Sequence, residues 1–227
     1  HPSQRAIKTF QQSSSREEGV EAMTTIRAET PADIEAISEV NRLAFGRENE
    51  ARLVETIRDT PGFIPALSLV AERDGRVVGH VLFSRIAIRT GGGPDIPALA
   101  LAPVAVLPEH QGQGIGAALI RTGLDRARDL GHRIVVVVGH PNYYPRFGFT
   151  PARAQGLEAP FPVSDPAFMA LALVPGALDG VHGLVVYPEA FDGGDTGAAM
   201  GVRGRRRPGM MAFGELDGTA TVPRARG

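Results

Sequence analysis

The sequence predicts an α/β fold built around one mixed β-sheet, and three observations lead to this prediction. Two β-rich runs are separated by the dipeptide Asp74-Gly75, which is a strong signal for a two-residue hairpin and hence for an antiparallel strand pair. An apolar run, a glycine-rich loop, a helical pattern and a second apolar run follow one another across residues 98–138. A strand, helix and strand in this order form a right-handed parallel crossover. Antiparallel and parallel pairs together predict a mixed sheet with helices packed against it.

The N-terminal elements are a strand at 24–29 and a helix at 30–45. Thr30 is a suitable N-cap residue and Pro31 suits the first helical position. Apolar residues then recur at helical spacing. A second helical stretch is expected near 48–59, just before the hairpin strands.

The later elements surround the glycine-rich loop. The apolar run 98–107 predicts a buried strand, residues 115–130 predict a helix that Gly131 ends, and 133–138 predicts another buried strand. Residues 168–191 add a further strand, a short turn and a final apolar run, which we expect to complete the sheet.

The two ends of the chain differ from its middle in composition, and this difference divides the sequence into three predicted regions. Residues 1–22 are polar and lack the apolar core of a secretory signal, so they are interpreted as a disordered extension or an artefact of the assigned start, with Met23 as the natural first residue. Residues 23–191 form the predicted domain. Residues 192–227 are rich in glycine and arginine and are interpreted as a disordered tail.

Composition narrows the classes of function. The chain has 227 residues, 43% hydrophobic residues, a formal net charge of −1 and no cysteine. Disulfides, thiolate metal sites and a cysteine nucleophile are therefore excluded, and a reducing, cytoplasmic location is expected. The charge balance does not favour nucleic acid as a partner, although an arginine cluster at 205–207 keeps that hypothesis open. The six histidines are dispersed without metal-ligand spacing, so no metal is expected, and no apolar run is long enough to predict a membrane partner.

Three glycines at alternate positions, Gly112, Gly114 and Gly116, stand where a strand leads into a helix. The first N–H groups of a helix are unpaired and its dipole favours negative charge, so this position suits a phosphate or pyrophosphate. Glycine removes the Cβ atoms that would block the approach of such a ligand. The alternative is a tight turn in which glycine only permits positive φ or close packing.

Two other phosphate-binding motifs fit this loop less well. The dinucleotide fingerprint can be read as Gly112-x-Gly114-x-x-Ala117, but it needs an acidic residue after the next strand, and none occurs between Leu130 and Leu157. A nucleoside-triphosphate loop needs Gly-Lys-Ser/Thr at its end, whereas Gly116 is followed by two alanines.

The stretch "VAVLPEHQGQGIGAALI" resembles motif A of the GNAT superfamily of acetyl-CoA-dependent N-acetyltransferases, whose loop reads Gln/Arg-x-x-Gly-x-Gly/Ala. The stretch "YPRFGF" resembles the end of the family's motif B. The residues that match are Gln111, Gly114 and Gly116 in motif A and Tyr144, Gly148 and Phe149 in motif B. The resemblance extends from about Thr24 to Val174 in element order.

This resemblance implies a mostly antiparallel mixed sheet, with helices on both faces and a central parallel pair, the fourth and fifth strands, splayed around an acyl-CoA cleft. Acetyl-CoA is the implied cosubstrate, with its pantetheine arm along Val104 to Val106 and its pyrophosphate on the loop amides. The implied cofactor-binding residues are Val104, Val106, Gln111, Gly112, Gln113, Gly114, Ile115 and Gly116.

The resemblance also implies direct transfer of the acetyl group to a primary amine of a small molecule or a protein. The backbone N–H of Val104 would meet the developing oxyanion, and Tyr144 would protonate the departing thiolate. The alternative function is a non-catalytic acyl-CoA sensor that keeps only the cofactor site. The oligomeric state is left open, with a homodimer as one possibility.

The motif B region departs from the family because "GHPNYYP" is shorter than the usual helix, which leaves the roles of Asn142 and Tyr143 open. The general base is open as well. Glu48 and Glu50 are expected on a solvated helix face, and His110 is expected beside the phosphate loop. The candidates for the base are Glu48, Glu50, Glu109, His110 and His140.

Overall fold

The computed structural model describes residues 23–191, so the two predicted extensions lie outside the described residues. The described part forms one sheet in the order β1-β2-β3-β4-β5-β8-β6, and β9 pairs with both β3 and β7. The strands are β1 (Thr24–Ala28), β2 (Ser68–Arg73), β3 (Arg76–Arg89), β4 (Ile96–Val106), β5 (Ile134–Val138), β6 (Thr150–Pro151), β7 (Leu157–Glu158), β8 (Phe168–Ala172) and β9 (Gly183–Val186). The helices are α1 (Ile34–Phe45), α2 (Asn49–Arg58) and α3 (Ile115–Asp129).

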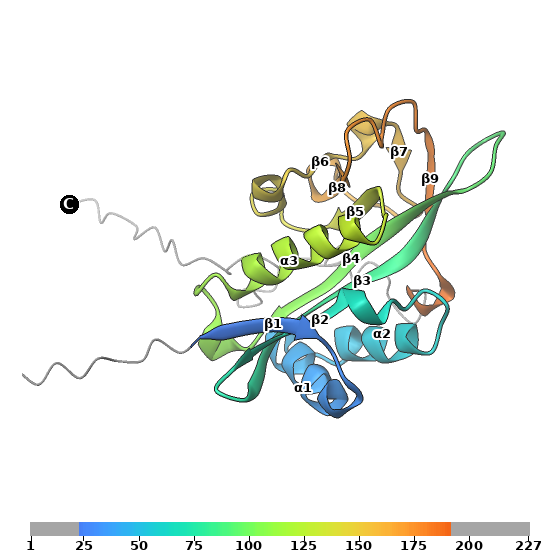
Figure 1. Cartoon of the computed structure of the whole chain (residues 1–227). Coiled ribbons are helices and arrows are strands. Elements are labelled where there is room, and N and C mark those ends of the chain that lie inside the picture. Colours follow the sequence, from blue (N-terminus) through green and yellow to red (C-terminus); the bar gives the residue numbers. More distant parts are fainter. Residues whose placement is uncertain (1–22, 192–227) are drawn as a thin grey trace, which may run out of the picture.

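The helices cover both faces of the sheet, with α1 and α2 on one face and α3 on the other (Figure 1). The side chains of β3 explain why helices pack on both faces, because successive side chains of a strand point to opposite faces of the sheet. A Cβ atom on Gly79 would lie 3.0 Å from the side chain of Leu119 on α3, whereas the neighbouring His80 contacts Asn41 on α1. The sheet is therefore the central layer of three.

The predicted start of the first helix is confirmed, although its first turn is a 3-10 helix (Pro31–Asp33). The N–H of Thr30 donates to the carboxylate of Asp33 at 2.7 Å, and the Thr30 hydroxyl donates to the same oxygen at 2.8 Å. The N–H of Asp33 donates in turn to the carbonyl of Thr30. These reciprocal bonds satisfy donors that the helix itself leaves unpaired.

The predicted hairpin is confirmed. β2 and β3 are antiparallel, and Arg73 pairs with Arg76 across the two-residue turn. Asp74 and Gly75 have φ angles of 51° and 74°. Positive φ at both central residues is what a type I′ turn requires, which is why Asp-Gly is favoured here.

The predicted parallel crossover is confirmed, and its two strands separate after a short contact. β4 pairs with β5 only at Leu99 and Ala100, although β4 continues to Val106. On its other side β4 carries one extra residue opposite β3, where the register shifts near Val81. Such a bulge bends the strand that contains it. The sheet is therefore mixed, mostly antiparallel and splayed between β4 and β5, as expected for its fold class.

The C-terminal segment completes the sheet at a place that the sequence did not indicate. β8 pairs with β5, as a continuation of the sheet would. β9 instead pairs with the far end of β3, where Ala87 lies opposite Val186. Within the described residues, no helix combines the length and apolar character needed to cross a membrane.

Candidate acyl-CoA site

The glycine loop joins the end of β4 to the start of α3 through a short 3-10 helix, η3 (Pro108–His110). Gly112 and Gly114 have φ angles of 74° and 78°, in the left-handed region. A Cβ atom on Gly114 would meet no atom of residues 23–191 within 4 Å, so these residues leave open the space in front of it. Gly114 is also the N-cap of α3, and within the described residues no side chain caps the helix there. The first N–H groups of α3 are thus available to an anion.

The two glutamines of the loop have separate positions. The side-chain amide of Gln111 donates to the carbonyl of Val106 at 3.0 Å, which ties the loop to the end of β4. The side chain of Gln113 turns the other way, accepting from Arg73 at 2.6 Å and donating to the carbonyl of Glu109 at 3.2 Å. Both side chains are therefore engaged within the protein, and the loop offers its backbone to a ligand.

The last residues of β4 present backbone groups toward the splay. The N–H of Leu107 donates to the carbonyl of Val78 in β3, at 2.9 Å. Backbone polar groups alternate sides along a strand, so those of Val104 and Val106 point away from β3. On that side the ladder with β5 ends at Ala100. The N–H of Val104 consequently faces the gap between β4 and β5, as does the edge of β4 to which it belongs.

Tyr144 lies across the splay, at the start of the 3-10 helix η4 (Tyr144–Phe147). Its side chain is buried, with only 3% of the residue exposed. The ring packs on Gly139, the residue after β5, and its centre lies 5.8 Å from that of Phe149. Tyr144 is therefore fixed against the end of β5, while Val104 belongs to β4.

Burial raises the pKa of Tyr144 above its ordinary value, and the neighbouring Tyr143 adds to this shift. The direction follows from the cost of placing a phenolate in an apolar environment. Tyr144 is accordingly a protonated phenol throughout the neutral range, and it can act as a hydrogen-bond donor or an acid.

Asn142 and Tyr143, whose roles the difference from the family's motif B leaves open, lie beside Tyr144. The ring of Tyr143 is buried, 5.3 Å from that of Tyr144 and 5.5 Å from that of Phe147. Asn142 is exposed, and its N–H donates to Nδ1 of His140 at 3.2 Å. Tyr143 is thus part of the aromatic packing around Tyr144, whereas Asn142 belongs to the turn before it.

The candidate bases are scattered, and one expectation about them is wrong. Glu48 is exposed as expected, but Glu50 is fully buried and both of its oxygens accept hydrogen bonds from Arg47. The first turn of α2 follows the end of α1 closely, which turns Glu50 inward with an arginine to neutralise it. Glu109 is exposed beside Arg76, at 3.6 Å. Sequence periodicity alone does not reveal the buried ion pair between Glu50 and Arg47.

His110 lies directly before the loop, as expected, and is half-buried. Its Nδ1 atom is buried without a hydrogen-bond partner in the described part of the chain. His140 is exposed on the turn after β5. The described residues contain no group of three or more side chains able to hold a metal ion.

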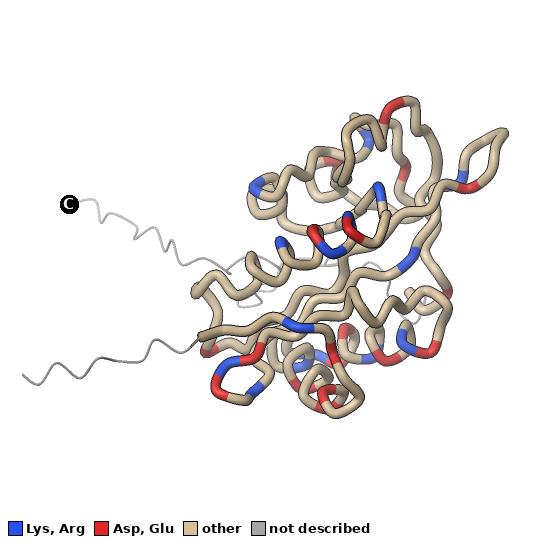
Figure 2. Tube along the Cα trace, in the orientation of Figure 1, with Lys and Arg blue, Asp and Glu red and all other residues tan. Residues whose placement is uncertain are grey.

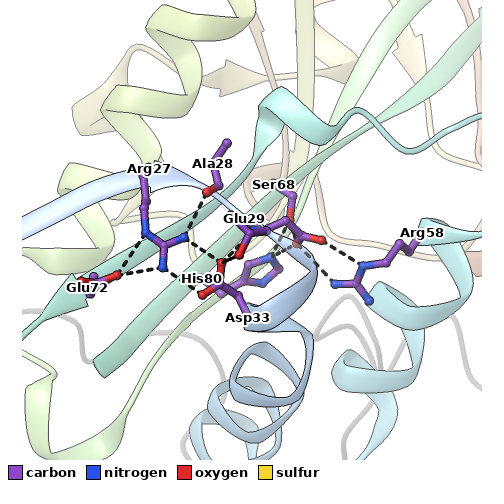
Figure 3. Close-up of polar contacts among 9 residues, drawn as sticks. Arg27, Ala28, Glu29, Asp33, Arg58, Ser68, Glu72 and His80 are labelled. Atoms are coloured by element: carbon purple, nitrogen blue, oxygen red, sulfur yellow. Dashed lines mark hydrogen bonds and ion pairs between the residues drawn. The ribbon is translucent and has the colours of Figure 1, made fainter. Parts of the chain in front are cut away.

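A second polar cluster lies on the opposite face of the sheet, beneath α1 and α2 (Figure 3). Arg27 forms ion pairs with Asp33 and Glu72, each at 2.7 Å. Glu29 pairs with Arg58 at 2.9 Å. This cluster joins β1 to β2 and to the helices, and Asp33, Glu29 and Arg58 are its more buried members.

His80 stands at the inner end of this cluster and is fully buried. The side-chain amide of Asn41 donates to the carbonyl of Ile37 at 2.9 Å, which orients its NH₂ group toward Nδ1 of His80 at 3.1 Å. Nδ1 must then accept, so Nε2 carries the proton and donates to the hydroxyl of Ser68 at 2.9 Å. The Ser68 hydroxyl donates to Glu29. The imidazole is held neutral, and burial lowers the pKa of His80 to about 3.

Two features of the molecule are not predicted by the sequence patterns. Gly139 is one of them, although a glycine directly between an apolar strand and a tyrosine-rich turn is a signal for close approach of a side chain. The cluster around His80 was missed because its members are far apart in the sequence and each is unremarkable alone.

Comparison with protein families gives a match to the model described as "Acetyltransferase (GNAT) domain" over residues 25–152. The N-acetyltransferase YjhQ of Escherichia coli is 45% identical over 136 residues, which cover 59% of this chain and 74% of the relative. The N-acetyltransferase YhbS of the same organism is 39% identical over 168 residues, which cover 74% of this chain and 98% of the relative.

Two solved structures are similar in both sequence and fold. The crystal structure of YhbS in complex with CoA has a TM-score of 0.70 and 36% identity, covering 75% of this chain and 93% of that one. A GNAT-family acetyltransferase from Brucella melitensis in complex with acetyl-CoA has a TM-score of 0.62 and 37% identity, covering 75% and 99%. The family model spans the loop, the splay and Tyr144, so this chain belongs to the GNAT family of acetyltransferases.

Proposed function

We propose that this acetyltransferase transfers the acetyl group of acetyl-CoA directly to a primary amine, with residues 23–191 as the catalytic domain. One observation supports the proposal above the others. The open edge of β4 at Val104, the anion-accepting start of α3 and the buried phenol of Tyr144 surround the same splay between β4 and β5.

Acetyl-CoA would bind through its pantetheine arm, whose amide groups resemble those of a peptide backbone, and through its pyrophosphate. The amide groups of the pantetheine arm pair with Val104 and Val106 as an added strand pairs with a sheet edge. The pyrophosphate rests on the amides of Gln111 to Gly116, where the left-handed glycines expose N–H groups without side-chain bulk. Cosubstrates of this kind are present in the two related crystal structures, with CoA in one and acetyl-CoA in the other.

The reaction proposed for this site needs no covalent enzyme intermediate. A neutral amine attacks the thioester carbonyl, and the N–H of Val104 donates a hydrogen bond to the resulting oxyanion. The tetrahedral intermediate loses a proton from nitrogen, and its C–S bond breaks. Tyr144 donates its proton to the departing thiolate and is reprotonated from solvent, which yields the amide and free CoA.

The proton on the incoming amine must leave before attack, because an alkylammonium ion has a pKa of about 10.4 and carries no free electron pair. Of the candidate bases, Glu50 is engaged by Arg47 and Glu109 is exposed beside Arg76. We therefore propose that this proton leaves through water, and we assign no side chain as the base.

Release of CoA thiol from acetyl-CoA, measured across a panel of small amines, amino acids and peptides, tests the proposal. Turnover with one class of amine, together with the N-acetylated product in a mass spectrum, is the expected result. Tight binding of acetyl-CoA without turnover for any amine would identify the domain as an acyl-CoA sensor instead. Absence of binding would overturn the assignment of the site.

A further inference from the structure

The tip of the β2–β3 hairpin reaches the glycine loop and the short helix before it. Nη1 of Arg73, the last residue of β2, donates to the side-chain oxygen of Gln113 in the loop at 2.6 Å. Nη1 of Arg76, the first residue of β3, lies 3.6 Å from Oε1 of Glu109 in η3. Figure 2 shows basic and acidic residues gathered at this tip, beside the chain that leads into α3. The hairpin therefore supports the loop from the side.

The two arginine contacts differ in kind. The pair between Arg76 and Glu109 is too long for a hydrogen bond, and its side chains are 58% and 54% exposed. Exposed ion pairs contribute little free energy, because water screens them and two long side chains must be held in place. Arg73 instead makes a short, charge-assisted hydrogen bond, which is a stronger type of contact. The contact of Arg73 is therefore the one that can fix the loop.

Arg73 is itself oriented by the edge of the sheet. Its Nε atom donates to the hydroxyl of Thr24, the first residue of β1, at 3.1 Å. Thr24 is also the partner of Arg73 in the ladder between β1 and β2. Two nitrogen atoms of the guanidinium are thus engaged, one by the sheet and one by the loop. The side chain joins the two.

Gln113 occupies the part of the loop where such support matters most. It stands between Gly112 and Gly114, which both have positive φ. Glycine has more backbone freedom than any other residue, so a segment with two glycines loses much entropy when a ligand orders it. The side-chain amide of Gln113 also donates to the carbonyl of Glu109 at 3.2 Å. Its two hydrogen bonds thus hold the segment whose N–H groups would meet the pyrophosphate.

We infer that Arg73 is a positioning residue for acetyl-CoA, an inference that rests on the proposed function. Acting through Gln113, it holds the loop in its anion-binding form before the cosubstrate arrives. Less conformational entropy is then lost on binding, and the affinity is higher. The pantetheine arm separates the pyrophosphate from the thioester, so the loop holds the pyrophosphate equally before and during the reaction. Arg73 should consequently affect affinity and leave kcat unchanged.

The inference is tested by calorimetric titration of the full chain with CoA. The variants are Arg73→Met, Gln113→Ala and the two combined, and the matched control is Arg76→Met, which removes the same charge from the same hairpin. Each of the first two should weaken binding about three- to tenfold, the size expected from one net hydrogen bond. The double variant should bind no more weakly than Gln113→Ala, because Arg73 acts through that side chain. Arg76→Met should bind nearly as tightly as the unchanged protein.

Two further measurements separate positioning from a general effect on the fold. With the amine identified by turnover, Arg73→Met and Gln113→Ala should each raise the KM for acetyl-CoA and leave kcat unchanged. In the ligand-free variants, the amides of residues 112–116 should exchange their hydrogens faster than in the unchanged protein.

Unchanged CoA affinity in Arg73→Met would overturn the inference and leave the proposed function intact. Equal weakening by Arg76→Met would also overturn it, because the charge of the hairpin would then be responsible instead of the contact with Gln113. Losses that multiply in the double variant would mean that Arg73 acts on the ligand directly, which contradicts the inference as well. A fall in kcat would show that the substitutions distort the site and would reject the positioning role. Failure of the unchanged protein to bind CoA would instead refute the proposed function.

Discussion

The ring of Tyr144 occupies the space that a side chain on Gly139 would need. A Cβ atom on Gly139 would lie 2.2 Å from Cε2 of Tyr144, far inside the contact distance of two carbon atoms. Since Gly139 directly follows β5, the end of that strand and the position of the phenol depend on each other. A single methyl group at Gly139 must displace the ring.

Gly139→Ala should therefore reduce kcat while acetyl-CoA affinity, which depends on β4 and the loop, changes little. The loss should approach the ~10²-fold effect of removing a general acid. Steady-state kinetics with the amine found in the screen, alongside direct binding of acetyl-CoA, measures both quantities. The control is Gly91→Ala, because a Cβ atom there would meet no atom of the described residues within 4 Å. An unchanged kcat in Gly139→Ala would show that the position of Tyr144 is unimportant.

Tyr144→Phe keeps the ring and its packing but removes the proton. We expect kcat to fall by ~10²-fold with little change in acetyl-CoA affinity. Because burial raises the pKa of Tyr144, the loss should be the same at pH 7 and pH 9, where the phenol of the unchanged protein is still protonated. Tyr187→Phe is the control, since this partly buried tyrosine also has a raised pKa but its ring packs on Phe191 instead. Full activity in Tyr144→Phe would transfer the role of the acid to water or Tyr143.

Gly114 and Gly131 form a matched pair at the two ends of α3. Their φ angles are 78° and 84°, and a Cβ atom on either would meet no atom within 4 Å in the part of the chain that the structure describes. Substitution by alanine at either position should lower the free energy of unfolding by about 1–2 kcal/mol, because the left-handed conformation is strained for any residue with a Cβ atom. Only Gly114→Ala should weaken acetyl-CoA binding, because only its Cβ would meet the pyrophosphate. Calorimetric titration and thermal unfolding of both variants separate these effects, and equal binding would remove the loop from the cofactor site.

The buried imidazole of His80 should make stability depend on pH. Its pKa is lowered to about 3 in the folded chain, whereas an unfolded histidine has a pKa of about 6.5. Below pH 6.5 the unfolded chain therefore takes up a proton that the folded chain does not. The contribution of His80 to stability is complete above pH 6.5 and declines by up to about 1.4 kcal/mol per pH unit as the pH falls toward 3.

Denaturant unfolding at pH 7.5, 6.0 and 5.0 measures this dependence. His80→Gln should have a shallower decline over this range, whatever its stability at pH 7.5. The difference in slope is the readout, so a general loss of stability in the variant does not obscure it. Parallel slopes for the two proteins would show that His80 does not take up its proton on unfolding.

The sequence predicted the parts of the fold that depend on local signals. Asp74-Gly75 determines its turn because both residues must adopt positive φ, and Thr30 determines a helix start because its own neighbours supply the hydrogen bonds. The order of β4, loop, α3 and β5 followed from apolar runs separated by glycines. These features need no information from distant parts of the chain.

The features that the sequence did not predict depend on contacts between distant segments. Glu50 appeared to belong to a solvated face, yet the turn between α1 and α2 buries it with Arg47. His80 becomes a neutral, desolvated group only because Asn41 and Ser68 arrive from other elements. Periodicity reports which face of an element is apolar, but it does not report which polar groups meet beneath that face.

The pairing of β9 with the far end of β3 has a consequence for how the domain is made. Ala87 and Val186 are far apart in the sequence, and among the strand pairs of the described residues theirs closes the longest loop. Contacts between such distant residues slow folding, because chain entropy is lost before the contact is formed. During synthesis, the outer end of β3 must wait for residues 183–186 to leave the ribosome before it gains its second neighbour. In the order of translation, the β2–β3 hairpin and the crossover of β4, α3 and β5 are thus complete before β9 can be added.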